Sequence, residues 1–185
     1  MKWIAGCLSF QKAVSHPALE RLASLRERDW PDLLAYSDRS GLTLYLLAAL
    51  ERAGLAANLP ESVRQTLRER QEKNRQRLAR TMEEAAEVLE ILRKAGLQAA
   101  MLKGFSLEPE FVAKADLRSQ YDLDWLLSPD DALGAHRLLL ERGYEQILEG
   151  ESLSHSHLPT LVRKTGWEWR GDYYDLDIPD RKSVV

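Results

Sequence analysis

The feature that most constrains the fold is a long helical segment that runs from about residue 58 to Lys94. Residues 58–62 (Asn-Leu-Pro-Glu-Ser) begin it, and Gly96 follows its end, where glycine commonly terminates helices. Apolar residues recur along it at helical steps: Val63, Leu67, Leu78, Met82, Ala85, Leu89 and Leu92. No seven-residue core repeat continues across residues 71–74, which argues against a coiled coil. The segment predicts one long amphipathic helix.

The character of the sequence changes after Gly96. Before it, helices are expected from His16, from Trp30 and over residues 42–53, because apolar spacing and proline or glycine breaks mark them. After it, residues 97–102 and 121–127 indicate strands, and Ser128-Pro129 begins a helix to Arg142. A final hairpin is expected from residues 158–162 and 166–174. We therefore predict an α+β protein with a helical region, 1–95, and an α/β core, 96–185.

Composition narrows the protein class. The 185 residues carry 26 basic and 29 acidic side chains, a net charge of -3, which argues against a surface that coats nucleic acid or membrane throughout. The single Cys7 excludes an internal disulfide framework and a cysteine-based zinc cluster. The longest apolar stretch, residues 42–50, is far shorter than the roughly 20 residues that span a bilayer. We expect a cytoplasmic protein with no membrane partner.

Basic residues are concentrated in the first half of the long helix. Seven lie between Arg64 and Arg80, against Glu69 and Glu72. One interpretation is a solvated face with ion pairs within the helix. The other is a basic surface that binds the phosphates of a nucleotide or RNA. Both interpretations stay open at this point.

Two acids in the second predicted strand carry the clearest chemistry. Asp122 and Asp124 are two residues apart, so in a strand both carboxylates project from the same face. Such a pair repels itself unless a cation neutralises it, and magnesium suits it because this ion combines carboxylates with substrate phosphates. Lys103-Gly104 ends the preceding strand, and the amides of a following helix would face an anion. The pattern favours a metal-bound triphosphate, while a solvent-facing strand is the alternative.

Three motifs together resemble an uncharacterised bacterial nucleotidyltransferase-like family of the polymerase-beta-like superfamily. They are residues 101–104 (Met-Leu-Lys-Gly), 117–127 (Leu-Arg-Ser-Gln-Tyr-Asp-Leu-Asp-Trp-Leu-Leu) and 141–144 (Glu-Arg-Gly-Tyr). The similarity covers roughly residues 85–179. It implies a nucleotidyltransferase-like mixed sheet with flanking helices, which would hold two magnesium ions and a nucleoside triphosphate (NTP).

The resemblance also implies roles for individual residues. Asp122 and Asp124 correspond to the catalytic metal ligands, and Gly104 takes the place of the turn glycine, with Lys103 and Ser106 as its neighbours. Arg118 would pair with a phosphate or an acid. The sequence departs from the superfamily pattern in one respect. Residues 103–106 (Lys-Gly-Phe-Ser) replace the Gly-Ser turn of that superfamily.

A second departure concerns the third carboxylate of such sites. No residue matches it, and spacing selects neither Asp175 nor Asp177. We therefore expect either an incomplete chain or a catalytically weak relative. We predict transfer of a nucleoside monophosphate from magnesium-bound NTP to an unknown hydroxyl-bearing acceptor. The alternative is a non-catalytic nucleotide- or protein-binding module that retains the fold.

Two further patterns lie in the last third of the sequence. His155 and His157 would share one strand face, but no third metal ligand accompanies them. Trp167 and Trp169, interleaved with basic residues, resemble a single-stranded nucleic-acid site, but alternating tryptophans on a hairpin more often pack against a helix. Nucleic acid is therefore a weakly supported partner.

Overall fold

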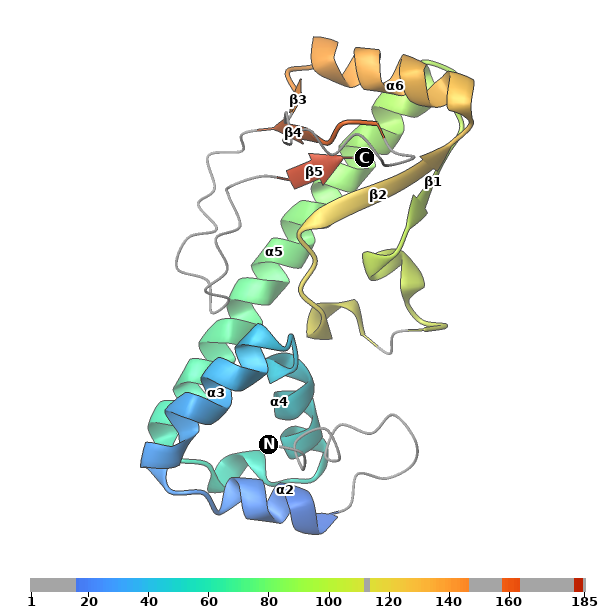
Figure 1. Cartoon of the computed structure of the whole chain (residues 1–185). Coiled ribbons are helices and arrows are strands. Elements are labelled where there is room, and N and C mark those ends of the chain that lie inside the picture. Colours follow the sequence, from blue (N-terminus) through green and yellow to red (C-terminus); the bar gives the residue numbers. More distant parts are fainter. Residues whose placement is uncertain (1–15, 112–113, 147–157, 164–181, 185) are drawn as a thin grey trace. The chain divides into compact units, whose positions relative to one another are not determined.

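The computed structural model describes residues 16–111, 114–146, 158–163 and 182–184 (Figure 1). The chain divides into two compact units. The first contains residues 1–75, 116–119 and 171–176, and the second contains residues 76–115, 120–170 and 177–185. The boundary between them falls within the long helix, so this helix contributes to both units. The domain boundary expected at residue 95 stays a prediction.

The first unit is helical. Its elements are α2 (His16–Ala23), the 3-10 turn η1 (Glu27–Asp29), α3 (Trp30–Arg39), α4 (Thr43–Arg52), η2 (Ala56–Asn58) and the beginning of α5 (Glu61–Lys94). Pro31 lies in the first turn of α3, where its missing N–H costs no helical hydrogen bond. Gly41 and Gly54 adopt positive φ after α3 and α4, which allows the chain to reverse. The helices predicted in this region are confirmed.

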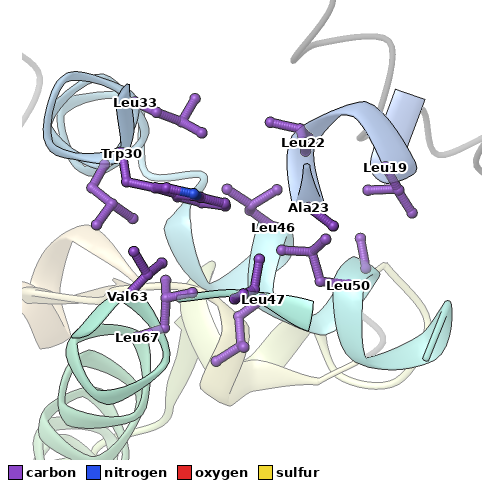
Figure 2. Packing of buried hydrophobic residues seen from close by; sticks show 13 residues of the cluster. Leu19, Leu22, Ala23, Trp30, Leu33, Leu46, Leu47, Leu50, Val63 and Leu67 are labelled. Atoms are coloured by element: carbon purple, nitrogen blue, oxygen red, sulfur yellow. The ribbon is translucent and has the colours of Figure 1, made fainter. Parts of the chain in front are cut away.

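Leucine side chains from all these helices form the first hydrophobic core. Figure 2 shows Trp30 extending into the interior toward Leu46, with Val63 and Leu67 of α5 close to it. Trp30, Leu22, Leu46, Leu50 and Leu67 are completely buried. Burial of each such leucine side chain contributes about 1.5–3 kcal/mol relative to leaving it in water. This core stabilises the first unit.

Helix α5 buries polar residues as well as apolar ones. Asn74, Arg77, Thr81 and Glu84 are each at most 4% exposed. In contrast, Met82 and Leu89, which the sequence pattern placed on the apolar face, are 48% and 47% exposed. The buried face of α5 keeps Val63, Leu67, Ala85 and Leu92 as predicted. It also includes polar positions that apolar spacing does not indicate, because specific polar partners offset the cost of burying them.

The second unit contains a mixed sheet and helix α6. Its strands are β1 (Ala99–Leu102), β2 (Asp122–Leu127), β3 (Glu145–Gln146), β4 (Leu161–Arg163) and β5 (Lys182–Val184), in the order β1-β2-β5-β4-β3. β1 and β2 are antiparallel, with Leu102 opposite Asp124, whereas β2 and β5 are parallel, with Asp122 opposite Ser183. Helix α6 (Pro129–Glu141) begins at Ser128, whose side chain accepts a hydrogen bond from the Asp131 amide at 3.2 Å.

The second core joins α5, α6 and the sheet. Its buried members are Val88, Ile91, Leu92, Ala135, Leu139, Tyr144 and Leu161. Beside it, the Tyr144 hydroxyl donates to the buried Glu84, and Arg163 donates to Glu84 at 2.7 Å and stacks on the Tyr144 ring. This network ties β4 to α5.

These observations confirm the α+β class, with a helical N-terminal region and a mixed sheet. The second arm of the predicted hairpin, residues 166–174, lies outside the described residues. Within the part of the chain that the structure describes, no helix has both the length and the apolar character needed to cross a membrane.

Candidate functional site

Strand β2 presents its two acids on one face. Leu123, between them, is 1% exposed, whereas Asp122 is exposed and the Asp124 side chain is 20% exposed. Because successive side chains of a strand point to opposite faces, the burial of Leu123 places both carboxylates on the other side. The structure therefore gives the acids the common face that their spacing predicts. Their role as metal ligands stays a prediction.

Lys103 lies directly beside the acid pair. It follows Leu102, the residue opposite Asp124 across the β1–β2 ladder. Its Nζ is 2.9 Å from Asp124 Oδ2, while 67% of the lysine side chain is exposed. The structure thus shows Lys103 in an ion pair with Asp124, and its contact with a phosphate stays a prediction.

A tight turn follows Lys103. Lys103 has φ 61° and ψ -170°, a conformation that only glycine adopts readily, and Gly104 has φ 60°. Gly104 is buried, and a Cβ there would overlap the Gln120 side chain. Glycine is thus required at 104 by a close approach as well as by its φ.

Gln120 connects this turn to the start of β2. Its side-chain oxygen accepts a hydrogen bond from the Phe105 amide at 2.9 Å, and its side-chain nitrogen donates to the Asp122 carbonyl at 2.8 Å. Gln120 is 8% exposed. The sequence did not predict a role for this residue, because its partner Phe105 lies 15 residues away and no motif spacing indicates the contact.

The helix expected after Gly104 is much shorter than predicted. Only the 3-10 turn η3 (Gly104–Leu107) follows, and the Phe105 amide is already bonded to Gln120. The Ser106 hydroxyl donates to the Lys103 carbonyl at 2.6 Å. Packing against Gln120 thus fixes the turn and engages the Phe105 amide that a helix N-terminus would direct at a phosphate. Nucleotide contacts of Gly104 and Ser106 stay predictions.

Arg118 lies in a segment, residues 116–119, that belongs to the first unit. Asn74 anchors this segment by donating to the Asp116 carbonyl at 2.7 Å, and Ser119 donates to Asn74 at 3.2 Å. The Arg118 side chain is exposed. Its pairing with a phosphate is untested.

The basic residues of α5 have several protein partners. Arg70 pairs with the buried Asp38 at 2.7 Å, Arg75 pairs with Asp116 at 3.5 Å, and Arg64 pairs with Glu61. Arg77 is buried with its guanidinium 4.7 Å from the Tyr121 ring centroid. Of the ion pairs named here, only Arg64–Glu61 lies within α5. Arg70 and Arg75 instead pair with acids outside this helix. Nucleic-acid binding stays untested.

The described residues partly fit the predicted magnesium site. Asp122 and Asp124 supply hard oxygen ligands, which match an ion that combines one or two carboxylates with substrate phosphates and water. Over residues 16–111, 114–146, 158–163 and 182–184, no three His, Cys, Asp or Glu side chains gather into a metal-binding group. These residues therefore fit one ion held jointly with a triphosphate, and a second ion would need a ligand from elsewhere.

Several predicted candidates lie outside the described residues. They are His155, His157, Trp167, Trp169, Asp175 and Asp177. The strand that pairs with β2 beside the acids, β5, contains lysine, serine and valine and no acid. The described part of the chain thus assigns no third carboxylate.

A separate cavity of about 520 Å³ lies in the second unit. Its lining is mostly apolar and comes from β2, α6, the end of α5 and the segment before β4, including Trp125, Leu133, Leu139 and Leu92. His136 is the one titratable side chain among the described lining residues. The described lining residues include none of the charged groups that a triphosphate requires, so they favour the acid pair over this cavity as its site.

Comparison with known families gives one match. Residues 26–178 match the family model described as an uncharacterised nucleotidyltransferase. No curated protein and no solved structure matches the chain. The matched range includes the helices from α3 onward, the Lys103 turn and the acid pair of β2.

Proposed function

Because the chain belongs to the uncharacterised nucleotidyltransferase family, we propose that it transfers a nucleoside monophosphate from magnesium-bound NTP to a hydroxyl-bearing acceptor. In this reaction the acceptor hydroxyl loses its proton to solvent water, and its oxygen forms a bond to the α-phosphorus. The bond between that phosphorus and the oxygen bridging to the β-phosphate breaks, and pyrophosphate leaves. The observation that carries the proposal is the pair of carboxylates on one exposed face of β2 beside a lysine.

Asp122 and Asp124 are proposed to hold the metal. When bound, magnesium would polarise the phosphoryl oxygens and offset the charge that develops during transfer. Leu123 anchors the strand in the interior, so the two carboxylates stay on the same face. Gln120 fixes the start of this strand to the turn at Phe105, which keeps Lys103 beside Asp124.

The remaining predicted contacts concern the triphosphate. Lys103, Gly104 and Ser106 lie in one turn next to the acids, and the lysine ammonium supplies a positive charge there. Arg118 is proposed as an additional phosphate ligand. The acceptor is identified only by the hydroxyl that the reaction requires.

The test is calorimetric titration of the full chain with Mg·ATP and the other Mg·NTPs. Asp122→Asn combined with Asp124→Asn should weaken binding at least about tenfold, because it removes both charged ligands. The control is Asp130→Asn with Asp131→Asn, which removes the same charge from the first turn of α6. If both double variants bind as the wild type does, the acid pair is not the site.

A non-catalytic module is the second candidate. The observation that favours it is that β5, paired with β2 next to the acids, supplies no third carboxylate. Measurement of pyrophosphate release at saturating Mg·NTP separates the two. If Mg·NTP binding depends on Asp122 and Asp124 but no pyrophosphate is released with any of a panel of hydroxyl-bearing acceptors, the protein is a non-catalytic module. Release that disappears in the double variant supports the transferase.

A further inference from the structure

Lys103 occupies a backbone position that suits glycine far better than lysine. Its φ of 61° with ψ of -170° lies in a region where a Cβ is strained. The neighbouring turn holds this conformation, since Ser106 donates to the Lys103 carbonyl and Gln120 bonds the Phe105 amide. Such strain at a candidate site points to a function of the side chain.

The side chain of Lys103 neutralises one of the two acids. Its Nζ is 2.9 Å from Asp124 Oδ2, within the range of a charge-assisted hydrogen bond. The lysine side chain is 67% exposed, whereas that of Asp124 is 20% exposed. An ammonium has three donors on a flexible stem, so an exposed lysine can exchange one anionic partner for another.

We propose that Lys103 is an exchangeable counter-ion of the acid pair. Without nucleotide, its ammonium neutralises Asp124. When a metal-bound triphosphate enters, Lys103 leaves Asp124 and pairs with the triphosphate, and the freed carboxylate becomes available to the metal. This inference rests on the proposed function and adds a regulation of the same site.

The exchange makes the acid pair select metal that arrives with a triphosphate. A free divalent ion must displace Lys103 from Asp124 and brings no anion to which the ammonium can transfer. An ion that carries a triphosphate gives the lysine a new partner in the same step. Lys103 therefore couples the two ligands, and by linkage each should raise the affinity for the other by the same factor.

The experiment titrates the full chain with Mn²⁺ and follows the EPR signal of the free ion, at constant ionic strength. It is done without nucleotide and with saturating α,β-methylene-ATP. Lys103→Met should bind Mn²⁺ alone about two- to fivefold more tightly, because a competing ion pair is removed. The gain in Mn²⁺ affinity caused by nucleotide should shrink about tenfold, because the triphosphate loses its charged partner.

Lys94→Met is the matched control. Lys94 is also an exposed lysine of the second unit, 68% exposed, with its Nζ 3.3 Å from Glu90. It lies at the end of α5, outside the turn and strand that carry the proposed site. This variant should change neither the affinity for Mn²⁺ alone nor the effect of nucleotide.

The outcomes separate this inference from the function on which it rests. If Lys103→Met leaves Mn²⁺ binding unchanged or weaker without nucleotide, or leaves the effect of nucleotide intact, the exchange is wrong and the pair is static. If wild type and Asp122→Asn with Asp124→Asn bind Mn²⁺ and nucleotide alike, the proposed function fails too. Lys103→Gln repeats the test should circular dichroism show that Lys103→Met is unfolded.

Discussion

The side-chain oxygen of Gln120 accepts a hydrogen bond from the main-chain N–H of Phe105 at 2.9 Å. The same side chain donates to the Asp122 carbonyl, so one buried amide holds the turn after β1 against the start of β2. The turn carries Lys103 and the strand carries the acids. A substitution that breaks this connection should therefore also change the position of Lys103 relative to the acids.

Removal of the Gln120 side-chain amide should destabilise the protein, because it breaks the connection between the turn and β2. Gln120→Leu leaves the Phe105 N–H and the Asp122 carbonyl without this partner, and should lower the free energy of unfolding by about 1–3 kcal/mol. Urea denaturation measures the loss. Gln65→Leu, at an exposed glutamine of α5 that bonds Glu69, is the control and should change stability by no more than about 0.5 kcal/mol. Equal effects would show that Gln120 has no special role.

Gly104→Ala should be more damaging than an ordinary substitution at positive φ. The added Cβ meets the Gln120 side chain, whereas at Gly96, with φ 75°, a Cβ meets no atom within 4 Å. We expect Gly96→Ala to cost about 1–2 kcal/mol from backbone strain. Overpacking should add about 1–3 kcal/mol at Gly104.

Thermal melts of the Gly104→Ala, Gly96→Ala, Gln120→Ala and Gly104→Ala/Gln120→Ala variants distinguish backbone strain from overpacking. Truncation of Gln120 should relieve the clash, so the cost of the double variant should be smaller than the sum of the single ones. Strict additivity would contradict the contact between these residues.

At position 103 a glycine variant should be more stable than an alanine variant, the reverse of the order usual within helices and strands. Both Lys103→Ala and Lys103→Gly remove the ion pair with Asp124, but only glycine tolerates φ 61° with ψ -170°. The glycine variant should therefore be more stable than the alanine variant by about 1 kcal/mol or more. Chemical denaturation of the two proteins measures the difference. An alanine variant as stable as the glycine variant would show that the position is unstrained.

The Tyr144 network should make stability fall at high pH. Burial, followed by the bond to Glu84, raises the pKa of the Tyr144 hydroxyl above its ordinary value. The folded state then keeps this proton at pH values where the unfolded chain loses it. This contribution to stability is complete below about pH 10, the ordinary tyrosine pKa, and declines as the pH rises further.

Tyr144→Phe tests this contribution. At pH 8 it should lower the free energy of unfolding by about 1–3 kcal/mol, since Glu84 loses a donor. The difference in free energy of unfolding between wild type and Tyr144→Phe should decrease between about pH 10 and 11. Only the wild type has the tyrosine contribution to lose. Tyr36→Phe, in the first unit, provides the baseline for loss of a phenol. A difference in free energy of unfolding between Tyr144→Phe and wild type that stays constant with pH would contradict the account.

The elements with strong local signals could be predicted from the sequence. Ser128 with Pro129 at the start of α6 illustrates this, because the cap and the fixed proline φ act within one turn. The acids of β2 are similar, since their common face follows from the two-residue period of a strand. Both depend on interactions between residues close in the sequence.

Features that depend on distant partners could not be predicted. Arg77 and Glu84 are buried because Tyr121 and Arg163, far along the chain, accommodate their charges. Apolar spacing therefore predicts burial for Met82, which is exposed. The contact between Gln120 and the Phe105 amide was not predicted either, because these residues are 15 positions apart. Apolar spacing alone carries no information about these polar contacts.

The central claim is that a metal-bound triphosphate binds at Asp122 and Asp124, and paramagnetic broadening tests it most directly. A ¹⁵N-labelled sample of the full chain is titrated with substoichiometric Mn²⁺ in the presence of ATP, and amide signals are followed by NMR. The account predicts that signals of residues 103–106 and 122–124 broaden first, and that Asp122→Asn with Asp124→Asn abolishes this. Broadening that begins elsewhere, for example at the acids of α6, while residues 122–124 remain sharp would contradict it.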